Sequence, residues 1–212
     1  MHTFQTPQPI AVVVDALAAD VIVTASDRTD TVVVVRPADE SKKADVRAAE
    51  HTEVEFRDGT LRVTTPKTWL TYTPFGGNPA ITVTIEVPTG SELKSTAGVG
   101  HVRGAGALGH CDLTVALGDI TIERPQGSVT AKTSKGDIRI GVATRGEIRL
   151  ETSVGELEVG INPGSAVHLE TDATVGTVQN TLAPVGSEPV DTVQVFARSS
   201  LGNVIVRHAD AA

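Results

Sequence analysis

The chain has 212 residues, of which 40% are apolar and 3% aromatic, and its formal net charge is −8. The apolar content is too high for a disordered chain, and the negative charge argues against binding nucleic acid, which requires a basic surface. A single cysteine, Cys111, excludes an intramolecular disulfide and a metal site built from several cysteines. It falls on the apolar phase of an alternating run, which predicts a buried thiol.

The first 90 residues predict an irregular β-rich region. Three runs rich in β-branched residues indicate strands, at residues 10–14, 21–25 and 31–36. Helix formers over 40–49 predict a short exposed helix. Next, Asp58 and Gly59 separate two alternating runs over 52–65, which predicts a hairpin. The clean alternation of residues 80–87 predicts another strand.

Between the hairpin and that strand lies a loop that holds three of the six aromatic residues: Trp69, Tyr72 and Phe75. Trp and Tyr concentrate at binding hot spots, so this loop is our candidate partner-binding site. The alternative is a lid that buries its rings over one end of the fold. The sequence leaves both interpretations open.

The second part of the chain, residues 91–212, is marked by glycines at steps of 9 or 10 residues. They are Gly100, Gly109, Gly118, Gly127, Gly136, Gly146, Gly155 and Gly164. Most are followed by a short apolar–polar alternation, which indicates a strand after each turn. A fixed period means one unit stacked on itself. We therefore predict an all-β fold, a β-solenoid of about 18 residues per coil with two strands each. It forms one domain over 1–212 with the N-terminal part.

Folding the chain at that period places residues of one kind above each other. One apolar ladder is expected to run inward through Val102, Ile120, Ile138, Leu157, Val178 and Val204. On the other strand, Val167 is expected to follow Ile148 inward, and Thr171 to follow Thr133 and Thr152. An outer ladder of Lys132, Glu151 and Glu170 and a step from Arg139 to Glu158 complete the pattern. The N-terminal region is expected to cover one end of the stack and the last coil the other.

No residue pattern predicts a catalytic, cofactor or metal site. Asp119, Asp137 and Glu156 form a row, but a straight row on a convex turn does not converge on a cation, so solvated turns are expected. The histidines are scattered without zinc spacing. Gly-x-Ser-x-Gly is absent, and the glycines precede strands rather than helices, unlike phosphate-binding loops.

Three stretches carry a family resemblance: Ile81–Gly90, the run Ser-Thr-Ala-Gly-Val-Gly-His-Val from Ser95, and the recurring Thr-Ser-x-Gly-[Asp/Glu]-[Ile/Leu]-x-[Ile/Val]. On these motifs the chain resembles the DUF4097 family, and the likeness covers essentially the whole chain. The resemblance implies a β-solenoid-like fold and an adhesin label, with surface display. It brings no catalytic residues.

These observations predict a non-enzymatic scaffold or interaction protein. Two alternatives remain: a polymerising cytoskeletal solenoid of the bactofilin kind, and an acyltransferase of the hexapeptide-repeat kind. We expect a protein partner or self-association, no nucleic acid and no insertion into a membrane. The N-terminus has neither a basic nor an apolar leader region, and no apolar run is long enough to span a membrane, which favours the cytoplasm.

Overall fold

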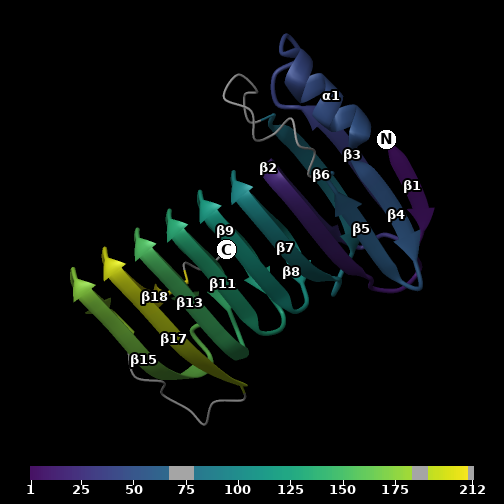
Figure 1. The fold of residues 1–212 in the computed structure, drawn as a ribbon. Helices are drawn as coiled ribbons and strands as arrows, with labels where there is room; N and C mark the ends of the chain where they lie inside the picture. The colour runs from purple at the N-terminus through teal and green to yellow at the C-terminus, as the bar shows by residue number, and fades with distance from the viewer. Residues whose placement is uncertain (67–78, 183–190, 210–212) are drawn as a thin grey trace.

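A computed structural model of the chain describes residues 1–66, 79–182 and 191–209 (Figure 1). The described residues form strands and one short helix, so the all-β prediction is confirmed. Most strands are parallel and build a nearly closed, barrel-like sheet. Its two halves, named sheet A and sheet B here, enclose one apolar core.

The N-terminal end contains antiparallel strands and the helix. Its elements are β1 (His2–Gln5), β3 (Asp30–Pro37), α1 (Lys43–His51), β4 (Glu53–Arg57), β5 (Thr60–Thr64) and β6 (Ile81–Pro88). In sheet A, β3 pairs antiparallel with both β1 and β6, and α1 lies against β3 and β6. In sheet B, β4 and β5 form the predicted hairpin, with Asp58 and Gly59 both at positive φ.

Strand β2 (Ala11–Ser26) passes from one half of the sheet to the other. Its first half pairs with β5 and β7 in sheet B, and its second half pairs with β6 and β8 in sheet A. The two separate strands expected over 10–14 and 21–25 are therefore wrong. Ala18 and Ala19 are both buried, so the alternation changes phase where the strand crosses.

After β2 the chain alternates regularly between the two halves. The strands are β7 (Glu92–Val99), β8 (Val102–Leu108), β9 (Cys111–Leu117), β10 (Ile120–Pro125), β11 (Val129–Lys135), β12 (Ile138–Ala143), β13 (Gly146–Val154) and β14 (Leu157–Ile161). Odd-numbered strands pair in sheet B and even-numbered strands in sheet A, all parallel. We call each odd strand with the even strand after it a rung. Ile120, Ile138 and Leu157 stack as predicted and have no exposed surface.

The last two rungs are stacked in an order that the sequence prediction did not foresee. They consist of β15 (Ser165–Val175) with β16 (Val178–Asn180) and of β17 (Asp191–Leu201) with β18 (Val204–His208). The final rung, β17/β18, inserts between β13/β14 and β15/β16. Val204 therefore stacks on Leu157, and Val178 follows Val204. The expectation that the last coil covers the C-terminal end of the stack is wrong, because β15/β16 lies there (Figure 1).

The shift continues in sheet B. Val195, rather than Val167, stacks on Ile148, and Leu169 follows Val195. The composition of the two rungs accounts for their order. Val193 and Val195 are fully buried, whereas the terminal rung places Asn180 in line with Val206. A polar side chain at a core-facing position destabilises the fold least in the terminal rung, because it stays exposed to water there.

The 18-residue glycine period has a backbone cause. Gly118 and Gly136 have φ near +140° to +148°, a conformation that L-residues rarely adopt. A Cβ on Gly136 would also lie 2.1 Å from the carbonyl oxygen of Gly118 in the neighbouring rung. The turns therefore stack backbone on backbone, and only glycine fits.

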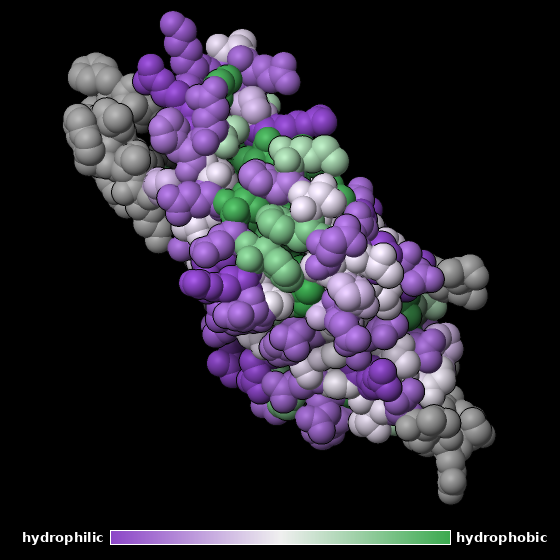
Figure 2. All heavy atoms as spheres, turned by 90° about the vertical axis from the view of Figure 1, so that its right-hand side faces the viewer, coloured by the Kyte–Doolittle hydropathy of each residue, from purple (hydrophilic) through white to green (hydrophobic). Residues whose placement is uncertain are grey.

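The N-terminal end carries partly exposed apolar side chains. The rings of Phe4 on β1 and Phe56 on β4 lie 5.3 Å apart and join the edges of the two sheets. Both rings are half-buried against the core. Figure 2 faces the side where β1 and β4 lie, and its apolar surface gathers in the upper part, while hydrophilic side chains dominate elsewhere.

Candidate functional site

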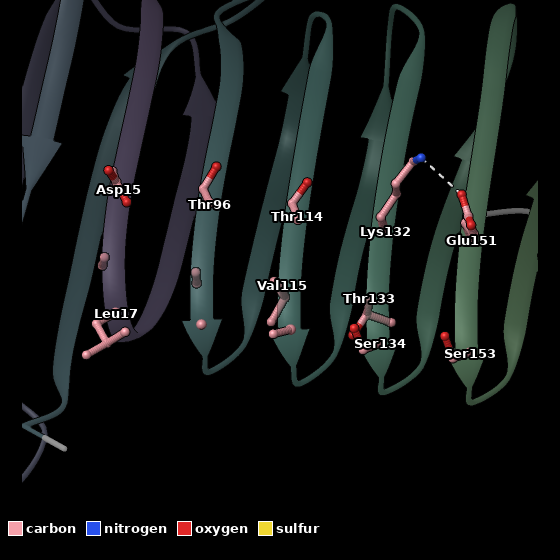
Figure 3. Close-up of a pocket in the computed structure, with 14 residues that line it drawn as sticks. Asp15, Leu17, Thr96, Thr114, Val115, Lys132, Thr133, Ser134, Glu151 and Ser153 are labelled. Atoms are coloured by element: carbon pink, nitrogen blue, oxygen red, sulfur yellow. Dashed lines mark ion pairs between the residues drawn. The ribbon is translucent and has the colours of Figure 1, made fainter. Parts of the chain in front are cut away.

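A shallow groove of about 510 Å³ runs across the outer face of sheet B. It crosses five neighbouring strands, β2, β7, β9, β11 and β13, near the ends of the last four (Figure 3). Its floor is made by small residues, namely Gly98, Ala116, Ser134 and Ser153. Because adjacent strands are about 4.8 Å apart, the groove extends for roughly 19 Å.

One in-register ladder supplies the polar side chains of the groove. It runs through Asp15, Thr96, Thr114, Lys132 and Glu151, one residue from each strand. Lys132 Nζ lies 3.0 Å from Glu151 Oε2, and this pair closes one end of the groove (Figure 3). The groove therefore offers hydroxyl donors and acceptors at a regular spacing, with charge at both ends.

The same ladder continues beyond the groove with alternating charge. Arg198 on β17 follows Glu151, and Asp172 on β15 follows Arg198. The predicted step from Lys132 to Glu151 is confirmed, but the step to Glu170 is wrong, because Glu170 pairs with Phe196. Direct stacking of β15 on β13 in the expected register would set Glu170 beside Glu151. The inserted strand instead places an arginine between two carboxylates, which favours the observed order.

Hydroxyl groups tie neighbouring rungs together where sheet B ends. Thr133 Oγ1 donates to the carbonyl of Gly118 at 3.1 Å, and Thr152 Oγ1 donates to that of Gly136 at 3.2 Å. Stacking of Thr133 on Thr152 is therefore confirmed. The next member is Ser199, not Thr171, because β17 is inserted. These bonds hold the glycine turns, and with them the end of the groove, in place.

The carboxylate row has a structural role beyond a solvated turn. Asp119 Oδ1 accepts the backbone N–H of Asp137 at 2.8 Å, and Asp137 Oδ1 accepts that of Glu156 at 2.7 Å. Each carboxylate thereby binds the turn of the next rung. Across residues 1–66, 79–182 and 191–209, no group of three or more His, Cys, Asp or Glu residues is placed to hold a metal ion.

Glu158 on β14 lies at the centre of a charge cluster on the outer face of sheet A. It accepts a hydrogen bond from Arg207 Nε at 2.8 Å and another from Arg139. Partial burial acts to raise the pKa of Glu158, but the hydrogen bonds from Arg207 and Arg139 outweigh it and lower the pKa below the ordinary value of a glutamate. The predicted step from Arg139 to Glu158 is confirmed, while Arg207 comes from the inserted rung.

Cys111 is buried in the core, as predicted, and burial raises the pKa of its thiol to about 12. The thiol is therefore protonated at neutral pH and is a poor nucleophile or metal ligand.

The candidate binding loop with Trp69, Tyr72 and Phe75 lies outside the described residues. The sequence did not predict the groove, because its small and hydroxyl-bearing residues occupy ordinary outward positions of alternating strands. The regular step from Thr96 to Thr114 was a usable signal.

The fold and the groove define a repetitive all-β protein with an extended outer surface. The chain belongs to the DUF2807 family, described as "Putative auto-transporter adhesin, head GIN domain", whose model matches residues 17–188. The DUF4097 name expected from the sequence is not confirmed, but the adhesin label agrees. None of the curated proteins compared with the chain matches it.

Several solved structures are similar to the chain, and two of them are described here. One is a "putative cell adhesion protein" from Clostridium sporogenes, 10% identical, with a TM-score of 0.55 and 98% of each chain covered. The other is a "putative adhesin" from Bacteroides fragilis, 12% identical, with a TM-score of 0.43 and 97% and 95% of the two chains covered. The first likeness supports the fold. Within the part of the chain that the structure describes, no helix has the length and apolar composition needed to cross a membrane.

Proposed function

We propose that the chain is a non-enzymatic adhesion module, a β-solenoid that binds a protein partner along the outer groove of sheet B. The groove is the observation that carries this proposal. Five parallel strands present polar groups in register there, over a floor of small side chains that leaves the backbone approachable. The family's adhesin description supports a binding role rather than a catalytic one.

The chemistry of the groove favours a polar, extended partner segment. Thr96 and Thr114 offer hydroxyl groups to a partner. Lys132 and Glu151 form an ion pair with each other, and each of them can instead pair with a charged group of the partner. Both side chains of that pair are about half-exposed, so separating them costs little. A second, smaller groove lies around Arg149 and Phe196 on the same face and extends the surface.

Attachment of protein-coated beads to cells tests this proposal. Thr114→Arg fills the groove with a long side chain, and we expect it to reduce the number of attached beads at least about tenfold. Gln194→Arg is the matched control, since Gln194 is exposed on the same sheet outside both grooves. Equal attachment by both variants, with melting temperatures near that of the parent, would contradict a role for the groove.

Location is part of the same proposal. The sequence favours the cytoplasm, whereas the adhesin description implies contact with the outside, so the cytoplasmic location stays a prediction. Fractionation of source cells, followed by protease treatment of intact cells, distinguishes the two. An adhesion module must be cleaved in intact cells, while a cytoplasmic scaffold is protected until lysis.

A further inference from the structure

The C-terminal end of the stack presents an unpaired strand edge in sheet B. Strand β15 is the terminal strand there and runs for 11 residues, and among the described residues it pairs only with β17. It lies at the end of the molecule opposite α1 (Figure 1). The backbone N–H and C=O groups on its outer side therefore have no partner strand in the described part of the chain. Such an edge is a template for pairing with another chain.

Every second residue of β15 directs its backbone to this free edge. In a parallel pair, the N–H and the C=O of one residue point to the same side, and successive residues alternate. The C=O of Val175 accepts the N–H of Gly202 at 2.9 Å, so Val175 faces the inserted rung. The even-numbered residues therefore face the free edge, namely Ala166, His168, Glu170, Asp172 and Thr174.

The side chains of β15 show that the core is also open at this end. Val167, Leu169 and Ala173 pack against the core but stay partly exposed, whereas Val193 and Val195 of the next strand are fully buried. At the opposite end, the edge strands β1 and β4 have only four and five residues, and α1 packs against β3 and β6. Short edge strands and covering helices are the devices that limit association of sheets. Among the described residues, the long β15 edge has neither.

We propose that β15 pairs antiparallel with β15 of a second copy of this chain, about a two-fold axis through Leu169. Leu169 then faces Leu169 of the second copy, Val167 faces its Thr171, and the pairing extends from Ser165 to Ala173. Each residue whose backbone points to the edge meets another such residue, so about eight backbone hydrogen bonds form. The half-buried core residues of the two copies also cover each other, which continues the apolar core across the axis.

Charges favour this register over its neighbours. His168 faces Glu170 of the second copy, so the imidazole can donate an N–H to the carboxylate, and symmetry repeats this pair. An axis through Glu170 would instead oppose two glutamates directly, which is destabilising. In the proposed register the two Glu170 side chains lie only diagonally, at about 7–8 Å, whereas the opposed pair is about 5 Å apart. Asp172 faces Ala166 and keeps its ion pair with Arg198, at 3.9 Å, within its own chain.

Head-to-tail stacking of copies is a poorer match. It would set β15 beside β4, which runs antiparallel to β5 and therefore to most of sheet B. With full overlap of the two charged stretches, Glu53 faces Asp172 and Glu55 faces Glu170. A shift by two residues in either direction still opposes one pair of carboxylates. The two-fold pairing avoids this repulsion and stops at two copies. The β15 edge lies outside the outer groove, so the pairing does not depend on the proposed adhesion role.

Sedimentation equilibrium of the full chain across a range of concentrations tests the proposal. We expect a reversible dimer in the parent, because one pair of edge strands buries less than the roughly 800 Å² per partner of a standard interface. Glu170→Pro removes an N–H that points to the free edge and keeps the bonds to β17, so the association constant should fall at least about tenfold. Thr174→Pro is the matched control, since Thr174 is exposed on the same edge outside the paired residues. Both variants should melt near the parent's temperature.

Two charge variants test the register. His168→Glu sets two glutamates opposite each other and should weaken the dimer at least about tenfold. Combining His168→Glu with Glu170→Lys places opposite charges across the axis again and should restore the dimer.

Cysteine substitutions test the position of the axis. Leu169→Cys chains should form disulfide-linked dimers by themselves, because the axis sets the two residues opposite each other with Cα atoms about 4.5 Å apart. Val167→Cys chains should link more slowly alone than in a mixture with Thr171→Cys chains. Cys111 does not compete because it is buried.

Four outcomes would overturn the proposal. A parent that stays monomeric at millimolar concentration leaves the edge to a strand of another protein. Species larger than a dimer indicate head-to-tail stacking. The proposal also fails if Thr174→Pro weakens the dimer as much as Glu170→Pro does, or if Leu169→Cys chains do not link.

Discussion

Two ladders of apolar side chains run side by side through this molecule, three residues apart on every rung. Leu117, directly before the turn glycine Gly118, is 49% exposed, whereas Ile120, on the other side of that glycine, is fully buried. The same holds for Val154 and Leu157, with 39% and no exposure. Apolar residues that recur with the same period are therefore exposed before the turn glycine and buried after it.

The cause of this difference is the turn between them. Leu117 has the same phase as the buried Leu113 and Val115, so alternation alone would bury it. The chain turns at Gly118 before the opposite sheet can cover that position, and the next core-facing residue is Ile120. The buried ladder therefore stabilises the fold, while the apolar residues just before the turn glycines stay in contact with solvent. The following predictions separate these two roles.

The largest loss of stability is expected for Gly136→Ala, at the point that separates the two ladders. The new Cβ would lie 2.1 Å from the carbonyl oxygen of Gly118, at a φ of +148° that alanine rarely adopts. Backbone strain alone costs about 1–3 kcal/mol, and since the clash is with backbone, we expect a total above about 4 kcal/mol. Urea denaturation measures it.

Gly164→Ala is the matched control for this glycine. Its Cβ would come no closer than 3.6 Å to a neighbouring atom, and Gly164 is exposed. We expect its unfolding free energy to stay within about 1 kcal/mol of the parent. Similar losses in the two variants would show that the turns do not require glycine for close approach.

A direct comparison of the ladders comes from Ile138→Ala and Leu117→Ala. Ile138 has no exposed surface and lies between Ile120 and Leu157, so its truncation leaves a cavity and should cost about 2–5 kcal/mol. Leu117→Ala should cost less than about 1 kcal/mol, because half of its side chain is already in water. Arg139→Ala, next to Ile138 but outward, should also cost less than about 1 kcal/mol. Equal denaturation midpoints for Ile138→Ala and Leu117→Ala would contradict the separation of roles.

The sequence predicted the repeated part of the fold well and its ends less well. Period and phase fix the stacking of Ile120 on Ile138, since any other register would expose isoleucine. They do not fix the order of the last two rungs, because both fit the same period. Only finer signals distinguish them: Arg198 between Glu151 and Asp172, and Asn180 at the end of the stack.

The exposed positions were harder to predict than the core. Leu117 and Val154 fall on the apolar phase, and only the point where each strand leaves the sheet shows that they are exposed. The groove depends on which outward residues are small on neighbouring strands, such as Gly98 and Ala116. That property becomes visible once the register is known. By contrast, the burial of Cys111 could be predicted directly, because the residue falls on the apolar phase of an alternating strand.

A smaller effect is expected in the carboxylate row formed by Asp119, Asp137 and Glu156. Asp137→Ala removes the acceptor of the Glu156 backbone N–H and should cost about 0.5–1.5 kcal/mol. Asp137→Asn keeps an oxygen acceptor and removes a negative charge near Asp119, so it should match the parent or exceed its stability at pH 7. Thermal unfolding of both variants measures the difference. A loss in Asp137→Asn as large as in Asp137→Ala would mean that the charge, rather than the hydrogen bond, stabilises the turn.

An effect of similarly small size, which depends on pH, is expected at Glu158 on the outer face of sheet A. Hydrogen bonds from Arg207 and Arg139 lower the pKa of Glu158 in the folded state. A carboxyl group with a lowered folded pKa stabilises the fold above its unfolded pKa, and this contribution is lost as the pH falls through the folded value. Glu158→Gln should therefore be less stable than the parent by about 1 kcal/mol at pH 7, since both arginines can still reach water. The difference should close as the pH falls through the lowered folded pKa of Glu158. Glu170→Gln, an exposed glutamate outside this cluster, should stay within about 0.5 kcal/mol of the parent at pH 7. If the gap between Glu158→Gln and the parent instead persisted at pH 3, packing of the side chain, and not its charge, would account for the stabilisation.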